Sequence, residues 1–224
     1  MTHFHSNNLA RRSSFRLSMR PCQHLPLPLL CKSLAVLLMA CPLTWATEED
    51  LIGVEESWEL VLRDPDPASA SPQISSAFSP IRDDDIFYAI LSLNHRQLGD
   101  DFAAGGLQLQ LWYGEHLIGQ RTSDKTEILA KPGEKVTWTQ SISVNGEGLM
   151  TFSIKNGSSD TWGSFGAPLS LQAWTNLRNL NSYQPSNSVK SSGMMFGANR
   201  VQSHRLTNVR VIFQSGESKN LRIP

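Results

Sequence analysis

Most of the 224-residue sequence lacks cysteine, since all three cysteines lie within the first 41 residues. Residues 47–224 therefore contain no disulfide and no thiolate ligand for a metal, and a catalytic cysteine is excluded there. Charge is also scarce: charged residues make up 18% of the chain, and 20 basic residues balance 20 acidic residues. Nucleic-acid binders usually carry a basic patch, so this balance predicts no nucleic-acid partner.

Long hydrophobic runs are absent too, because no run reaches the roughly 20 apolar residues that a membrane-spanning helix needs. A short apolar run, Ser33–Cys41, follows five basic residues and no acidic residue, and a small-residue site ending at Ala46 comes after it. This order is typical of a secretory signal. We therefore expect residues 1–46 to be a signal segment, and an exported mature chain with no transmembrane span.

Two features leave the processing of this segment open. Leu38–Cys41 resembles a bacterial lipobox, which would place a lipid on Cys41 instead of a cut after Ala46. Met19 is an alternative start to Met1, because it gives a more compact signal. The expected location is accordingly secreted, periplasmic or at the cell surface.

From Trp58 onward the apolar residues recur mostly at every second position, in short runs separated by Gly, Pro, Asn and Asp. This spacing predicts strands and turns, and no long run shows helical periodicity. The clearest hairpin is predicted for Leu107–Gly119. Two Asn-Gly pairs, at 145–146 and 156–157, are expected to end strands in tight turns. Further strands are expected at 58–62, 73–78, 86–93, 136–144, 149–154, 169–174, 193–196 and 206–213.

Some nine or ten short strands without a repeat of fixed length indicate a single antiparallel sandwich. We expect this β-sandwich domain at 57–215, after an acidic linker at 47–56 and before a C-terminal tail at 216–224.

The strand order, together with the segments Asn156–Gly166 and Gly197–Val201, resembles the jelly rolls of the concanavalin A-like lectin/glucanase superfamily. The resemblance covers about Trp58–Phe213 and rests on architecture, not on a motif. It implies an all-β, antiparallel two-sheet sandwich of jelly-roll type, with sugars or other extracellular polymers as the ligand class.

No constellation of residues identifies an enzyme. The Glu-x-Asp-x-x-Glu strand motif of jelly-roll glucanases, a Gly-x-Ser-x-Gly elbow and a phosphate-binding loop are all absent. After the signal the histidines are His95, His116 and His204, and they stand at no metal-binding spacing. We therefore assign no catalytic residue and no metal ligand.

The acidic cluster Asp83-Asp84-Asp85 precedes a predicted strand. It is interpreted as a solvated turn, with a Ca²⁺ contact as the alternative. Because Ca²⁺ needs six to eight oxygen ligands, three adjacent aspartates cannot hold it alone. The expectation is no cofactor, with Ca²⁺ as the alternative.

Aromatic residues give the better functional argument. Trp162 and Phe165 occur in a loop rich in Gly, Ser and Asn that packing alone would not require, and such rings can stack on the apolar faces of sugars. The alternative for Trp162 is that its ring anchors the loop. The predicted ligand-binding set is Trp162, Phe165, Tyr183, Asn199 and Arg200. Tryptophans within predicted strands are instead expected to fill the core, namely Trp112, Trp138 and Trp174.

Three functions follow from these observations. The leading hypothesis is a secreted or cell-surface bacterial module that binds a polysaccharide, a glycan or another extracellular ligand without catalysis. The second is a glycoside hydrolase or polysaccharide lyase with an unrecognised site that uses Glu115, Asp160 or Arg200. The third is a structural envelope or assembly protein whose partner is another envelope protein.

Overall fold

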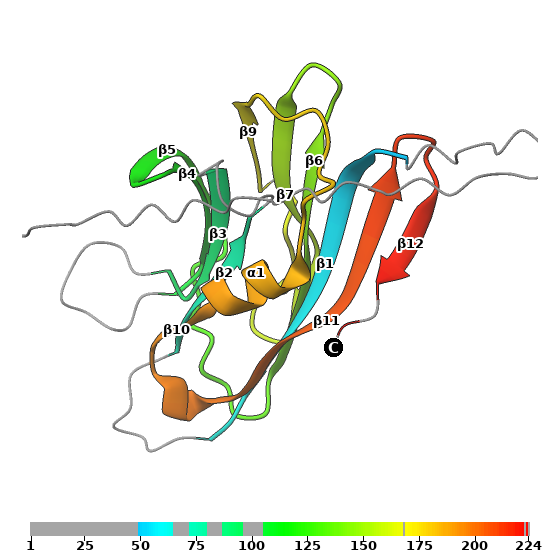
Figure 1. Cartoon of the computed structure of the whole chain (residues 1–224). Coiled ribbons are helices and arrows are strands. Elements are labelled where there is room, and N and C mark those ends of the chain that lie inside the picture. Colours follow the sequence, from blue (N-terminus) through cyan, green and yellow to red (C-terminus); the bar gives the residue numbers. More distant parts are fainter. Residues whose placement is uncertain are drawn as a thin grey trace, which may run out of the picture. The chain divides into compact units, whose positions relative to one another are not determined.

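The computed structural model describes residues 49–64, 72–79, 87–95, 105–167, 169–221 and 223. Within these ranges the fold is all-β, with two antiparallel sheets, one short helix and one 3-10 turn (Figure 1). This confirms the β-sandwich expected from the period-two apolar pattern. No helix in the described part of the chain is long and apolar enough to cross a membrane. The predicted signal segment, with its site at Ala46, lies outside the described residues.

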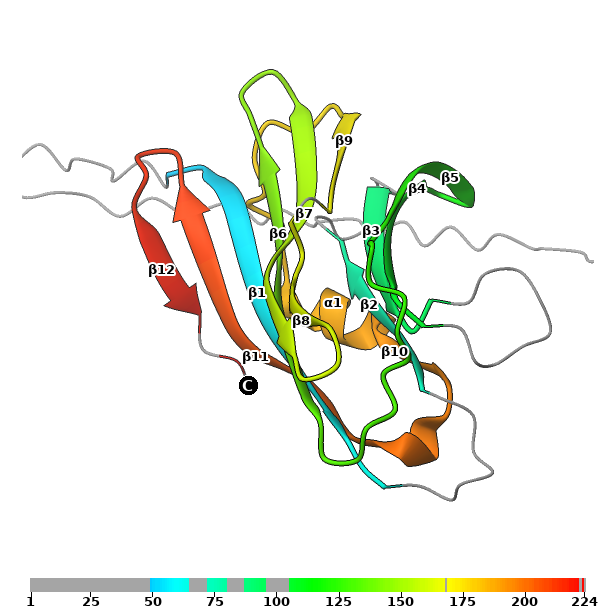
Figure 2. The same ribbon diagram turned by 180° about the vertical axis from the view of Figure 1, so that it is seen from behind.

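Among the described residues, the larger sheet has seven strands in the order β12-β11-β1-β6-β7-β8, with β9 also paired to β7. Its strands are β1 (Leu51–Leu62), β6 (Lys135–Val144), β7 (Leu149–Ser159), β8 (Gly163–Phe165), β9 (Ser170–Trp174), β11 (Val201–Phe213) and β12 (Ser218–Leu221). Figure 2 shows this sheet from behind, with β12 at its edge.

The smaller sheet, over the same described ranges, has five strands in the order β10-β2-β3-β4-β5. Its strands are β2 (Gln73–Phe78), β3 (Phe87–Leu93), β4 (Leu107–Tyr113), β5 (His116–Thr122) and β10 (Gly193–Phe196). The strands predicted at 73–78 and 193–196 are confirmed with the same limits, and the hairpin predicted for Leu107–Gly119 is β4 and β5.

Alternation along each strand places one face in a core that the two sheets share. In β3, Ala89, Leu91 and Leu93 are buried in this core, whereas the residues between them face away from it. Phe78 of the smaller sheet meets Phe152 of the larger sheet edge to face, with ring centroids 6.2 Å apart. Burial of one such large apolar side chain contributes about 1.5–3 kcal/mol to folding, so this alternation holds the sheets together.

A short helix, α1 (Pro185–Ser191), lies between β2 and β11 and contacts both (Figure 1). Sequence analysis did not predict it, because seven residues are too few to show helical periodicity. Pro185 stands at its start, where a missing N–H costs nothing. After its last turn, Ser192 Oγ donates to the Ser188 carbonyl at 2.7 Å and accepts from the Ala77 N–H at 2.9 Å. The second bond ties the helix to β2.

The larger sheet extends beyond the predicted limits of the sandwich. β1 begins at Leu51, inside the predicted linker 47–56, and β12 lies inside the predicted tail 216–224. The reason is long-range pairing, since β1 is hydrogen-bonded to β11 on one side and to β6 on the other. Such pairing offsets the high polarity of both segments, which made them look like loops in the sequence.

The two Asn-Gly pairs have different roles. Asn145 Oδ1 accepts from the Leu149 N–H at 2.8 Å, and this bond closes the expected turn between β6 and β7. Asn156 has a φ of 51° but does not end its strand, because β7 continues to Ser159. The prediction of a strand end there was wrong. The positive φ coincides with a shift of the β6–β7 register, which is typical of a β-bulge.

Only one of the three strand tryptophans is in the core. Trp138 is 1% exposed, as predicted, whereas Trp174 is 66% exposed and Trp112 is half-buried on the outer face of the smaller sheet. The prediction for Trp112 and Trp174 was wrong because each lies at the outward-facing position of its strand. Trp112 shares its face with Gln108 and Gln110.

Candidate functional site

The predicted ligand-binding residues occupy three places in the fold, and their rings are covered. Trp162 and Phe165 are 2% and 7% exposed, and their rings meet edge to face with centroids 5.5 Å apart. Trp162 Nε1 also donates to the Glu127 carbonyl at 2.9 Å. This packing corresponds to the anchoring alternative for Trp162, so the ligand role of both rings stays a prediction.

Tyr183 is 8% exposed, and its hydroxyl donates a short hydrogen bond to Glu56 in the core. Asn199 and Arg200 lie together in the 3-10 turn η1 (Ala198–Arg200) that precedes β11. The Asn199 side chain is exposed, and the backbone carbonyl of Asn199 accepts a hydrogen bond from Arg63 Nε. The structure therefore joins Trp162 to Phe165 and Asn199 to Arg200, and it places Tyr183 in a different cluster.

Sequence analysis missed that cluster, which surrounds a carboxyl group in the core. Glu56 of β1 is 0% exposed and accepts hydrogen bonds from Trp58 Nε1 at 3.0 Å and Gln140 Nε2 at 2.8 Å. Gln140 stands opposite Glu56 in the β1–β6 register. Its amide also donates to the Ala77 carbonyl at 3.1 Å and accepts from Ser76 Oγ at 3.1 Å, and both partners belong to the other sheet.

Electrostatics in this cluster shift the Glu56 carboxyl group toward its protonated form. Burial raises the pKa of Glu56 above its ordinary value, and the hydrogen bonds that the carboxylate accepts oppose this effect only in part. Burial and the Glu56 carboxylate together raise the pKa of the Tyr183 hydroxyl. Glu56 is fully buried, and the void beside Gln140 admits no water. The cluster therefore links the two sheets through buried hydrogen bonds.

A different arrangement lies on the outer face of the smaller sheet, where Thr122 is exposed, Gln110 and Trp112 are half-buried and Gln108 is buried. Three side chains of β4 form a hydrogen-bonded row there: Trp112 Nε1 donates to Gln110 Oε1 at 3.2 Å, and Gln110 Nε2 donates to Gln108 Oε1 at 2.7 Å. Gln108 Nε2 continues the row to Thr122 Oγ1 of β5 at 3.1 Å. We call Trp112, Gln110, Gln108 and Thr122 the glutamine ladder.

An aromatic pair lies at one end of the glutamine ladder. The rings of Trp112 and Tyr88 stack with centroids 6.3 Å apart and an interplanar angle of 4°, because the two residues are direct neighbours in the β3–β4 register. Tyr88 OH donates to the Gly114 carbonyl at 3.1 Å, which holds its ring in place. Both rings are half-buried. Part of each ring is therefore open to a ligand.

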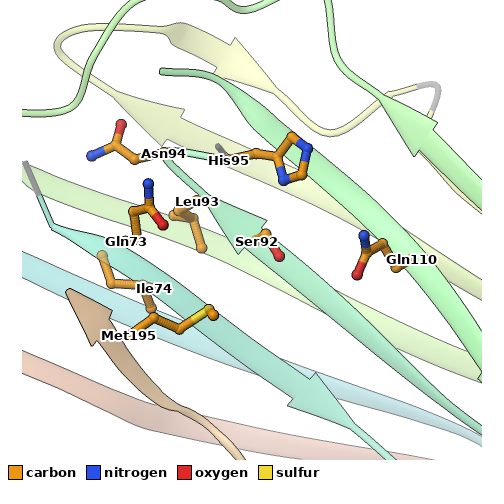
Figure 3. Close-up of a pocket in the computed structure, with 8 residues that line it drawn as sticks. All are labelled: Gln73, Ile74, Ser92, Leu93, Asn94, His95, Gln110 and Met195. Carbon is orange, nitrogen blue, oxygen red and sulfur yellow. The ribbon is translucent and has the colours of Figure 1, made fainter. Parts of the chain in front are cut away.

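Toward the other end of the ladder lies a cleft of about 310 Å³. Figure 3 shows Gln73, Ser92 and Gln110 on three neighbouring strands, with Met195 of β10 beside β2. The remaining lining residues are Ile74, Leu93, Asn94 and His95. None of these described lining residues is an acid, a lysine or an arginine, and burial lowers the pKa of His95. The described lining is therefore uncharged at neutral pH.

Two amides of the cleft differ in how they are bonded. Asn94 is 0% exposed and uses its amide within the protein, where it donates to the Pro72 and Leu129 carbonyls and accepts from the Leu129 N–H. It positions the end of β3. Gln73 Nε2 is buried and has no hydrogen-bond partner in the described part of the chain.

The described residues of the glutamine ladder, the aromatic pair and the cleft include the imidazole of His95 but no carboxylate. The described lining contains no carboxylate pair of the kind that glycoside hydrolysis needs. The residues predicted for an enzyme lie on separate turns. Glu115 is exposed on the turn between β4 and β5. Asp160 lies on the turn between β7 and β8, where it pairs with Lys131 at 2.9 Å. Arg200 lies in η1.

Metal binding finds no support among the described residues, which contain no group of three or more His, Cys, Asp or Glu side chains that could hold a metal ion. The cluster Asp83-Asp84-Asp85, for which Ca²⁺ was the alternative, lies outside the described residues.

No protein-family model matches this chain, and no curated protein matches it. Among solved structures, the chain is similar to the crystal structure of scytalido-glutamic peptidase with a transition state analog inhibitor. The match has a TM-score of 0.23 and 12% sequence identity, and it covers 77% of this chain and 84% of that chain. At this level of similarity, neither a fold type nor an activity follows from it.

Proposed function

We propose that this protein binds an uncharged polysaccharide or glycan, without catalysis, on the outer face of its smaller sheet. The observation that carries the proposal is the continuous row of the glutamine ladder, with the Tyr88–Trp112 pair at one end and an uncharged cleft toward the other. The resemblance to concanavalin A-like jelly rolls supports the same ligand class. Export through the signal segment at 1–46 is part of this proposal.

The chemistry of the face suits a sugar. Each sugar hydroxyl both donates and accepts a hydrogen bond, and side-chain amides do the same. Gln110 would bind a sugar hydroxyl in the cleft, because its Nε2 keeps one N–H beyond the bond to Gln108. Trp112 and Tyr88 provide a flat apolar surface for one face of a sugar ring. The cleft falls in the range of about 300–1,000 Å³ that is usual for small-ligand sites.

The proposal is tested by binding of the purified protein to neutral polysaccharides such as β-glucan, xylan and mannan, with an anionic polysaccharide for comparison. We expect saturable binding to at least one neutral polymer, and its loss in Gln110→Ala and in Ser92→Phe, which fills the cleft. Gln202→Ala and Trp174→Ala change exposed residues of the larger sheet and are the matched controls. No saturable binding, or equal loss in the controls, would contradict the proposal.

A structural envelope or assembly role is the second candidate. It is favoured by β5, an edge strand of the smaller sheet on which Leu117 and Ile118 are 43% and 47% exposed. Exposed edges of this kind can pair with another chain. A stable protein partner that is lost in Leu117→Lys, together with absence of sugar binding, would favour this candidate.

A further inference from the structure

A second cleft, of about 400 Å³, lies between α1 and β11 and shares no lining residue with the cleft beside the glutamine ladder. Trp58 of β1 and Leu206 of β11 stand opposite each other in the strand register and form part of its wall. Pro185 and Val189 of α1 line it from the helix, and Ile223 lines it from the C-terminal segment. The cleft is therefore mainly apolar. We call it the helix cleft.

An imidazole extends this apolar wall. His204 lies against Trp58, with ring centroids 5.0 Å apart, and against Trp138 at 5.9 Å. Burial lowers the pKa of His204 to about 4, so the ring is uncharged at neutral pH. The wall of the helix cleft thus carries two flat rings, those of Trp58 and His204, and neither is charged at neutral pH. It suits the apolar part of a ligand.

Charge is confined to two other lining residues, and both are basic. Lys190 lies in the last turn of α1, is exposed, and has no ion pair within the described residues. Arg205 donates to Glu59 at 2.6 Å, and Lys135 binds the same carboxylate. No described lining residue is acidic. The positive charge of Lys190 therefore favours an anion.

We propose that the helix cleft binds a small amphipathic carboxylate, with its apolar body against Trp58, Leu206 and Val189 and its carboxylate beside Lys190. This ligand is distinct from the sugar proposed above, and the two sites use different residues. The volume of about 400 Å³ sets the scale, since it accommodates a medium-length acyl chain or an aromatic acid.

Octanoate, octanol and octylamine are suitable probes, because they share an apolar chain and differ in the head group. Trp58 lines the cleft, so tryptophan fluorescence of the full-length protein reports binding. We expect saturable binding of octanoate, weaker binding of octanol and the weakest binding of octylamine. Octanol binding as tight as octanoate would overturn the assignment of an anion, and absence of saturable octanoate binding would overturn the site.

Two variants locate the binding. Val189 is 48% exposed, so Val189→Trp is expected to fill the cleft without loss of core packing and to abolish octanoate binding. Lys190→Ala is expected to weaken octanoate about two- to fivefold, as for the loss of one exposed ion pair, and to leave octanol unchanged. Ile118→Trp and Arg121→Ala are comparable substitutions of exposed residues on β5 and are the controls. Undiminished octanoate binding in Val189→Trp would place the ligand elsewhere and overturn the proposal.

Discussion

Gln140 of β6 donates a hydrogen bond to the fully buried carboxyl group of Glu56 on the neighbouring strand, and its amide also bonds to Ser76 and Ala77 of the opposite sheet. One side chain thus connects three strands from both layers of the sandwich. Such a network stabilises only while each member is bonded, because an unpaired polar group in the core is costly. The first two predictions follow from this relationship.

The Glu56 carboxyl group should make the stability of the protein depend on pH. Burial raises its pKa, so the folded state prefers the protonated form, and stability falls as pH rises from the ordinary value of 4.5 through the raised pKa. Glu56→Gln mimics the protonated group at every pH. We expect the wild type to lose stability relative to Glu56→Gln as pH rises above 4.5, as measured by urea unfolding. Glu147→Gln, at an exposed turn, is the control, and parallel curves for wild type and Glu56→Gln would contradict the prediction.

Loss of the Gln140 amide should destabilise the fold strongly. Gln140→Leu replaces the amide with an apolar side chain of similar size. It leaves Ser76 Oγ and one acceptor site of Glu56 without their partner. Each group left unsatisfied in the core costs about 1–3 kcal/mol, so we expect a decrease of about 2–4 kcal/mol in the free energy of unfolding. Gln202→Leu on the exposed face of β11 should change it by less than about 0.5 kcal/mol. Equal effects of the two substitutions would refute a structural role for Gln140.

Replacement of Trp162 should destabilise the fold much more than replacement of Trp174, because Trp162 is buried and Trp174 is exposed. Trp162→Ala removes a ring that is 2% exposed and packed on Phe165, and we expect a loss of about 3–5 kcal/mol. Trp174→Ala removes a ring that is 66% exposed, and its effect should stay within about 0.5 kcal/mol. Thermal unfolding followed by circular dichroism measures both. If Trp162→Ala folds normally and loses sugar binding alone, the ring contacts ligand and does not anchor its loop.

His204 should titrate well below the ordinary histidine pKa of 6.5. Burial lowers its pKa from the ordinary 6.5 to about 4, so the folded state prefers the neutral ring and stability is lost as pH falls from 6.5 through 4. A titration of the imidazole signals by NMR measures this pKa directly. His204→Phe keeps a ring against Trp58 but cannot titrate, so it should be less sensitive to acid than the wild type. A pKa near 6.5 for His204 would disprove its burial against the two tryptophans.

The faces of individual strands could be predicted from the sequence. Leu107, Leu109 and Leu111 alternate with Gln108, Gln110 and Trp112, and this pattern alone places the leucines in the core and the other three outside. The glutamine ladder was therefore visible in the sequence. Trp112 was assigned to the core because tryptophan is large and apolar, although its position in the alternation indicated the outer face.

The network around Glu56 was partly visible as well. Val54, Glu56 and Trp58 alternate in the same way, so the period-two pattern would have placed Glu56 on the inward face of β1. It was missed because the acidic residues before Trp58 indicated a linker. The partners of Glu56 could not have been found, since Gln140 and Tyr183 are separated from it by 84 and 127 residues.

Alternation is a local property of the chain, because each strand directs successive side chains to opposite faces wherever it lies. For this reason the all-β class and most strand positions follow from the order of the residues. Which strands become neighbours depends on packing between distant segments, and this packing brought Glu56 to Gln140, covered Trp162 with Phe165 and formed both clefts. Burial of a given side chain is therefore decided by the assembled sandwich, because only there is it settled which surfaces lose their contact with water.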